Sequence, residues 1–164
     1  MRVEFVTPFI QAAKEVLEAE LGVETVRGNI RLHKSAYTTD DVTALVGVTG
    51  QVSGLVLYSL AEPAARVIVS RMMGQEFGEL DALAQSGIGE LGNVITGRAA
   101  VLLADAGFRS NIAPPVLILG RGTMVTTLDM NRLVVPLRTA VGELQIQVVL
   151  KETAAPGARA GLAA

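Results

Sequence analysis

Apolar and polar positions follow two different periods along this chain, which predicts helices and strands in separate blocks. In the first block, apolar residues recur at helical spacing until Gly22. Thr7 is a typical N-cap and Pro8 a typical first helical residue. We therefore predict a first helix over about residues 7–21.

The next block has the period of two that is typical of strands. Residues 26–33 and 44–60 are rich in β-branched residues and are interrupted by glycine and by the sequence TGQ. They predict three antiparallel strands with a tight turn near Thr49 and Gly50.

Two further helices are expected in the middle of the chain. Residues 62–74 have Pro63 near the start and Gly74 at the end, the asymmetry of a short helix. Residues 79–108 then carry apolar positions at helical intervals over roughly seven turns before Gly107. This second pattern predicts the longest element of the molecule.

The C-terminal part of the chain returns to strand patterns. Four segments predict strands: residues 114–120, 123–128, 132–139 and 143–152. Asn131 is expected in a polar turn, and Pro136 is expected at an edge or bulge because it lacks an N–H. The small residues of 153–164 predict a frayed tail.

Together these elements predict one domain over residues 1–152 of the α/β (α+β) class. A mostly antiparallel sheet is packed with helices in a sandwich-like arrangement, and the long helix exposes one side. The composition agrees, since 50% of the 164 residues are hydrophobic and 18% are charged.

Charge and composition also exclude several classes of protein. The net charge is only −2 and no Lys/Arg cluster is present, so nucleic-acid binding is not expected. The absence of cysteine excludes disulfides, thiol nucleophiles and cysteine-ligated metals. No stretch reaches the ~18 apolar residues of a membrane span, and acidic residues interrupt the N-terminal region where a signal peptide would be apolar. We expect a cytoplasmic protein without a membrane association.

The long helix separates into two faces when it is projected at about 100° per residue. One side collects apolar residues: Leu80, Ala84, Ile88, Leu91, Ile95 and Leu102. The opposite side carries Ser86, Glu90, Asn93 and Gly97 in one axial row, here called the motif row. A carboxylate and a carboxamide therefore point the same way one turn apart.

Glycine is unusually frequent around this row. Residues 86–97 contain four glycines, each costing about 1 kcal/mol relative to alanine in a helix interior. One interpretation is a helix without bulky side chains, whose Gly89 and Gly97 let another surface approach so that Glu90 and Asn93 reach into it. The other is an ordinary solvated face whose glycines serve internal packing, and the E-x-x-N spacing alone does not decide between them.

Other candidate sites have weaker support. His33 has no recognisable partner set for a metal or a triad, and Asp40 and Asp41 are expected to cap or turn a loop. Residues 119–124 contain a G-x-G without the full nucleotide-binding fingerprint. The methionine pair 72–73 is expected to fill the core.

The motif S-x-x-x-E-x-x-N-x-x-x-G and its flanking segments resemble the CheX branch of the CheC/CheX family of chemotaxis response-regulator phosphatases. The resemblance runs from about residue 5 to residue 152. It is carried by FVTPFIQAAKEVL, VGVTGQVSGLVLYSL, IVSRMMG, SGIGELGNVITGRA and VVPLRTAVGELQIQVVL. CheC-type relatives carry the E-x-x-N motif twice, whereas the first helix here has no copy, which favours the CheX type.

The resemblance implies a phosphatase acting on a phosphorylated CheY-like receiver domain. Asn93 would orient the attacking water and Glu90 would pair with a receiver lysine. Ser86, Gly89 and Gly97 would contact the partner, although the Ser86 hydroxyl has the alternative of bonding to its own helix.

The same resemblance implies no metal or cofactor of the chain's own, since the partner supplies the aspartyl phosphate and Mg2+. It also implies a homodimer joined through the sheets. The alternative function is a non-catalytic module that docks a receiver or another signalling protein with the same helix face.

Overall fold

The computed structural model describes residues 1–34, 36–127 and 130–154, and three helices and ten strands lie in this part of the chain. The helices are α1 (Val3–Leu21), α2 (Glu62–Met73) and α3 (Ala82–Asp105). The strands are β1 (Val26–Arg27), β2 (Arg31–His33), β3 (Tyr37–Thr38), β4 (Val42–Gly50), β5 (Val52–Leu60), β6 (Ser110–Ile112), β7 (Val116–Leu119), β8 (Met124–Val125), β9 (Arg132–Thr139) and β10 (Gly142–Glu152).

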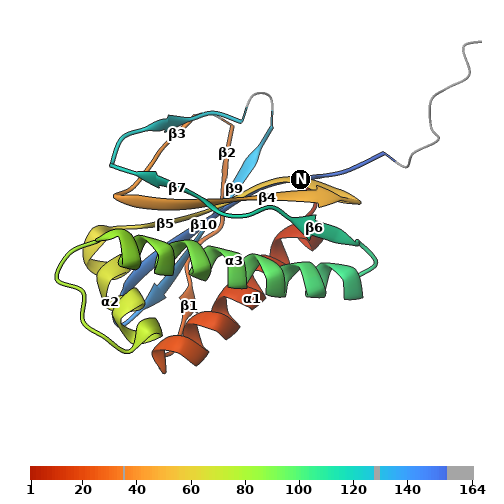
Figure 1. Cartoon of the computed structure of the whole chain (residues 1–164). Coiled ribbons are helices and arrows are strands. Elements are labelled where there is room, and N and C mark those ends of the chain that lie inside the picture. The colour runs from red at the N-terminus through yellow and green to blue at the C-terminus, as the bar shows by residue number, and fades with distance from the viewer. Residues whose placement is uncertain (35, 128–129, 155–164) are drawn as a thin grey trace, which may run out of the picture.

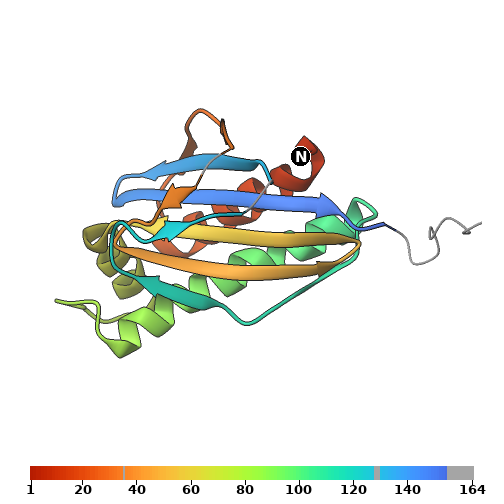
Figure 2. The same cartoon turned by 90° about the horizontal axis from the view of Figure 1, so that it is seen from above.

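The main sheet is antiparallel and has the strand order β1-β9-β10-β5-β4-β6, with β2 also pairing with β9 and β7 also pairing with β4. All three helices lie on one face of this sheet (Figures 1 and 2). A second, two-stranded sheet of β3 and β8 lies on the other side (Figure 1). The predicted α+β class with a mostly antiparallel sheet is therefore confirmed.

The first predicted strand region contains one hairpin and two short edge strands. The turn between β4 and β5 lies at Gly50, whose φ of 115° favours glycine, as the sequence predicts. Residues 26–33 form β1 and β2 rather than a single strand, so four strands replace the three expected. The break falls at Gly28, where an added Cβ would lie 2.7 Å from the Pro136 Cγ.

The same break explains how Pro136 fits inside β9. The Gly28 N–H donates to the Pro136 carbonyl at 2.8 Å, on the side of β9 where β1 and β2 pair. In an antiparallel strand the N and the carbonyl of one residue point to the same side. The missing N–H of Pro136 therefore faces the gap between two short strands. Because β9 pairs on both sides, Pro136 does not lie at the sheet edge, and the gap between β1 and β2 accommodates it instead.

The start of α1 was predicted wrongly. The helix begins at Val3 with Arg2 as its N-cap, so Pro8 lies inside it and the Thr7 hydroxyl donates to the Val3 carbonyl at 3.2 Å. Phe5 supplies the reason, because it is buried and packs edge-to-face on Phe108 with ring centroids 5.1 Å apart. Tertiary packing thus extends the helix by one turn before the proline.

The other predicted elements agree more closely. α2 ends at Gly74 in the left-handed conformation, and both β9 and β10 fall where the pattern places them. Two short strands, β3 and β6, were not predicted. Most of the predicted C-terminal tail, residues 155–164, lies outside the described residues.

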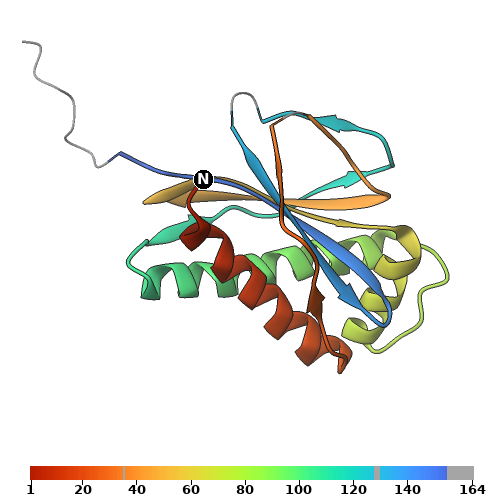
Figure 3. The same cartoon turned by 180° about the vertical axis from the view of Figure 1, so that it is seen from behind.

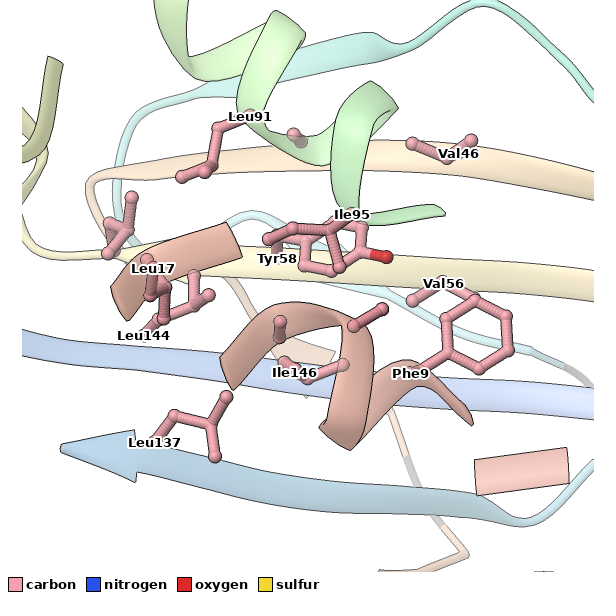
Figure 4. Packing of buried hydrophobic residues seen from close by; sticks show 14 of the residues in the cluster. Phe9, Leu17, Val46, Val56, Tyr58, Leu91, Ile95, Leu137, Leu144 and Ile146 are labelled. Atoms are coloured by element: carbon pink, nitrogen blue, oxygen red, sulfur yellow. The ribbon is translucent and has the colours of Figure 1, made fainter. Parts of the chain in front are cut away.

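The core fills the space between the helices and the sheet. Figure 4 shows Phe9 and Leu17 from α1 and Leu91 and Ile95 from α3 pointing toward Ile146 of β10 and its neighbours. None of the described helices combines the length and the apolar character that crossing a membrane requires.

Candidate functional site: the exposed face of α3

The helix α3 begins at a side-chain cap and is held firmly on the sheet. The Asp81 carboxylate accepts a hydrogen bond from the Ala84 N–H at 2.8 Å, which satisfies one of the free donors of the first turn. The predicted apolar side is confirmed as the inner side, because Ala84, Ile88, Leu91 and Ile95 are buried.

A buried polar contact fixes α3 directly beneath the motif row. The Tyr58 hydroxyl of β5 and the Thr96 hydroxyl lie 2.7 Å apart, and Thr96 also donates to the Gly92 carbonyl at 2.7 Å. Both side chains are buried, and burial raises the pKa of Tyr58, so its proton stays in place. The contact couples the position of α3 along its axis to the sheet.

The motif row lies on the outer side of α3, as predicted. Ser86 and Glu90 are exposed, while Asn93 and Gly97 are half-buried. The side chains of Glu90 and Asn93 make no hydrogen bond or ion pair with any residue of 1–34, 36–127 or 130–154. Ser86 donates its hydroxyl to the Ala82 carbonyl at 3.0 Å, which is the intrahelical alternative considered for it.

The four glycines divide between internal packing and the outer face. A Cβ on Gly87 would lie 2.2 Å from the Val69 Cγ2 of α2, and a Cβ on Gly92 would lie 3.2 Å from the Ala44 Cβ of β4. Packing inside the molecule therefore requires glycine at position 87, and at position 92 it leaves a methyl group only a tight fit. A Cβ on Gly97 would have only an ordinary contact, 3.8 Å from the Ile112 Cδ1, so the interior does not require glycine there.

Gly89 does not join the exposed row. It is buried, and a Cβ there would lie 3.7 Å from the Pro115 Cγ. The chain between β6 and β7 therefore covers Gly89, whereas Gly97 stays on the open side of the helix. Of the two glycines expected to admit a partner, only Gly97 is placed to do so in the structure.

Three exposed apolar residues border the motif row and were missed by the sequence analysis. Leu83, Val94 and Val101 are 48%, 40% and 51% exposed, and we call them the apolar collar. On a helical projection they fall within about 40° of Glu90, so the same calculation could have found them.

The flanks of α3 are formed by α1 and by the segment between β6 and β7. On the α1 side, the Arg98 Nε donates to the Glu15 Oε2 at 2.7 Å. This hydrogen bond, together with one from Gln11, lowers the pKa of the Glu15 carboxyl. The motif row therefore lies on a helix that is packed on one side against α1 and on the other against the segment between β6 and β7.

The side chains of this face can position a water molecule, but asparagine cannot transfer a proton. A carboxamide does not titrate in the useful range, but its oxygen and NH2 group can hold a water in one orientation. The Glu90 carboxylate is an acceptor for a cationic side chain. About 4.5 Å of helix rise separates the two residues, so both can enter one small site on another molecule.

The remaining candidates lie away from this face. His33 lies exposed on β2, and Asp41 accepts a hydrogen bond from the Glu62 N–H at 2.8 Å, which confirms the capping role predicted for it. Arg121 of the G-x-G segment binds the carboxylates of Asp40 and Asp41 at 2.9 and 3.0 Å.

The methionine pair divides between the core and the surface. Met72 packs partly buried against the core, whereas Met73 is 39% exposed, so the core role was predicted wrongly for Met73.

The model of the family described as "Chemotaxis phosphatase CheX" matches residues 42–138, which is more than half of the chain and includes Glu90 and Asn93. The chain belongs to the CheX family. It is 34% identical over 122 residues to the CheY-P phosphatase CheX of Thermotoga maritima, a match covering 74% of this chain and 79% of that protein.

Solved structures show the same CheX fold. A CheC-like superfamily protein from Shewanella sp. PV-4 has a TM-score of 0.83 at 27% identity, covering 92% of this chain and 99% of that one. The CheX-CheY-BeF3-Mg2+ complex from Borrelia burgdorferi contains a chain with a TM-score of 0.78 at 25% identity, covering 92% and 100% of the two chains.

Proposed function

We propose that this chain hydrolyses the aspartyl phosphate of a CheY-like receiver domain. The observation that carries the proposal is the pair of outward-facing side chains of Glu90 and Asn93 on α3, which have no hydrogen-bond or ion-pair partner among the described residues. The CheY-P phosphatase of Thermotoga maritima and the CheX-CheY complex of Borrelia burgdorferi support a receiver of this type as the substrate.

In this mechanism Asn93 enters the receiver's site and orients the attacking water. An aspartyl phosphate is an activated acyl phosphate, and its hydrolysis requires a water in line with the bond that breaks. The Asn93 carboxamide can accept a hydrogen bond from the water and donate one, which fixes its direction. No nucleophile from this chain is needed.

Glu90 aligns the two proteins by pairing with a receiver lysine beside the phosphoryl group. Such a pair becomes shielded from solvent when the helix docks, which strengthens it relative to an exposed pair. The receiver supplies both the phosphorylated aspartate and Mg2+, which neutralises phosphoryl charge when bound. The apolar collar provides the surrounding contact area. The absence of a side chain at Gly97 leaves room for the receiver beside Asn93.

The test compares phosphate release from a phosphorylated receiver with and without the natural chain, and then with Asn93→Ala. We expect the variant to lose at least about 100-fold in rate, the magnitude typical of removing one positioned catalytic group. Asn29→Ala is the matched control, because Asn29 is an exposed asparagine in the loop between β1 and β2. It should release phosphate at the natural rate.

The outcome also separates catalysis from docking. Release that is unchanged by Asn93→Ala would exclude the mechanism. Receiver binding by the natural chain without any acceleration of release would instead support the non-catalytic docking module.

We further propose that the chain works in the cytoplasm as a homodimer joined through its sheets. The outer edge of β7 supports this arrangement, because Val116 and Leu119 there are 57% and 49% exposed. Sedimentation equilibrium over a range of concentrations tests it, and a monomer throughout would exclude it.

A further inference from the structure

A pocket of about 620 Å3 opens between α1, the β1–β2 segment and the start of β9. Figure 3 shows α1 with β1 and the chain leading to β2 beside it. The pocket shares no residue with the motif row or the apolar collar. Its volume falls in the range of about 300–1,000 Å3 that is typical of small-molecule sites.

The inner surface of this pocket is apolar. Val6 is buried and Ile10 and Leu133 are partly buried against the core, while Ile30 remains 37% exposed above them. These side chains come from α1, β9 and the β1–β2 loop, so the apolar surface has walls on more than one side. A small apolar group placed there would be removed from water by all three elements.

The charges at the rim favour an anion. Glu15 is engaged by Arg98 at 2.7 Å, and Glu18 accepts the Thr25 N–H at 3.1 Å. Lys14 and Arg27 also line the pocket, yet neither forms a hydrogen bond or an ion pair within the described ranges 1–34, 36–127 and 130–154. Arg98 neutralises Glu15, whereas the N–H bound to Glu18 is neutral and leaves that carboxylate its charge. Lys14 and Arg27 therefore outweigh one remaining negative charge at the rim, which leaves it net positive.

We propose that this pocket binds a small amphiphilic anion. Its apolar body, of about the size of an eight- to ten-carbon chain, occupies the space over Val6, Ile10 and Leu133. Its anionic head, a carboxylate or a phosphate monoester, binds Lys14 and Arg27. The proposal is independent of the phosphatase activity, since none of the pocket residues belongs to the motif row or the apolar collar.

The test is a titration of the isotope-labelled full chain with decanoate, followed by NMR and kept below the micelle concentration. We expect saturable shifts confined to the backbone of α1, β1–β2 and the start of β9. Each CH2 removed should weaken binding by up to about fourfold, so octanoate should bind up to about 16-fold more weakly than decanoate. Decyl phosphate, titrated in parallel, shows which anionic head the site prefers.

Two comparisons isolate the charge. Decyltrimethylammonium has the same tail and a cationic head, and it should bind the natural chain at least tenfold more weakly than decanoate. The double variant K14Q/R27Q should bind decanoate at least tenfold more weakly. Arg31→Gln is the matched control, because Arg31 is an exposed cation on neighbouring β2 outside the pocket lining, and it should bind as the natural chain does.

Several results would overturn the proposal. These are equal binding of the anionic and cationic amphiphiles, equal binding by K14Q/R27Q and the natural chain, shifts centred elsewhere, or no saturable binding. The comparison of the two amphiphiles uses only the natural chain, so it decides the question even where a variant folds poorly.

Discussion

Gly97 is the residue at which stability and docking are expected to conflict. Alanine fits there with an ordinary contact of 3.8 Å, so Gly97→Ala should raise the free energy of unfolding by up to about 1 kcal/mol through helix propensity. The added methyl group lies on the open side beside Asn93. We therefore expect kcat/KM toward a phosphorylated receiver to fall about tenfold, from overpacking of an otherwise close contact. Urea unfolding and phosphate release measure the two effects.

Gly89→Ala is the matched control for this experiment. Its Cβ would also find an ordinary contact, at 3.7 Å, but against Pro115 and away from the motif row. It should gain similar stability and keep its activity. If both variants lost activity equally, helix stiffness rather than the open space at Gly97 would be the cause.

The outward direction of the motif row could be predicted at this scale because helical geometry is local. The spacing of three residues along one helix fixes the relative directions of Glu90 and Asn93, and no knowledge of the fold is needed. The burial of Gly89 could not be predicted in the same way. It depends on Pro115, which is distant in sequence and is brought to α3 by the pairing of β6 and β7 with β4.

At the scale of the element, α3 presents an apolar border around two polar groups. Val101 is 51% exposed, and its burial on docking should contribute about 1 kcal/mol. We expect Val101→Ser to raise KM for the phosphorylated receiver about fivefold and to leave kcat unchanged, because in the proposed complex the residue contacts the partner and not the reacting atoms. Steady-state phosphate release at varied receiver concentration separates the two constants.

Val26→Ser provides the comparison for that variant. Val26 is 55% exposed on β1, which lies at the opposite end of the strand order from β4 and β6, both in contact with α3. Its replacement should change neither kcat nor KM. A fall in kcat for Val101→Ser would show instead that the collar positions Asn93.

Element boundaries were harder to predict than element types. The propensity of Thr7 and Pro8 for a helix start is real, but burial of Phe5 against Phe108 outweighs it and moves the start to Val3. Short strands such as β3 are similarly fixed by their partners, since β3 pairs with β8 across a long separation in sequence. Long amphipathic patterns were predictable because their own period specifies them.

At the scale of the whole molecule, Asp41 connects parts of the chain that are distant in sequence. Its carboxylate accepts from the Glu62 N–H at the start of α2 and from Arg121 Nε at 3.0 Å. The Asp41 carbonyl accepts the Gly120 N–H at 2.9 Å, so the segments before β4 and after β7 are joined at the same point. The hydrogen bond from Glu62 and then that from Arg121 lower the pKa of the Asp41 carboxyl.

This connection predicts how stability depends on pH. A carboxyl whose pKa is lower in the folded state binds fewer protons there than in the unfolded chain, so it stabilises the fold above the unfolded pKa of about 3.9. The contribution is lost as the pH falls through the lower folded value. We therefore expect Asp41→Asn to be less stable than the natural chain at pH 7, with the difference shrinking below about pH 4. Urea unfolding at a series of pH values checks this.

The comparison with Asp40→Asn separates the helix cap from the ion pair. Asp40 also binds Arg121, at 2.9 Å, but it does not accept from the first turn of α2. If the N-terminal hydrogen bond is the larger cause, Asp40→Asn should lose less stability at neutral pH than Asp41→Asn. Added salt should weaken the Arg121 contribution and leave more of the cap, because an exposed ion pair is screened. Equal losses in both variants, abolished equally by salt, would show that the two carboxylates stabilise the fold only through Arg121.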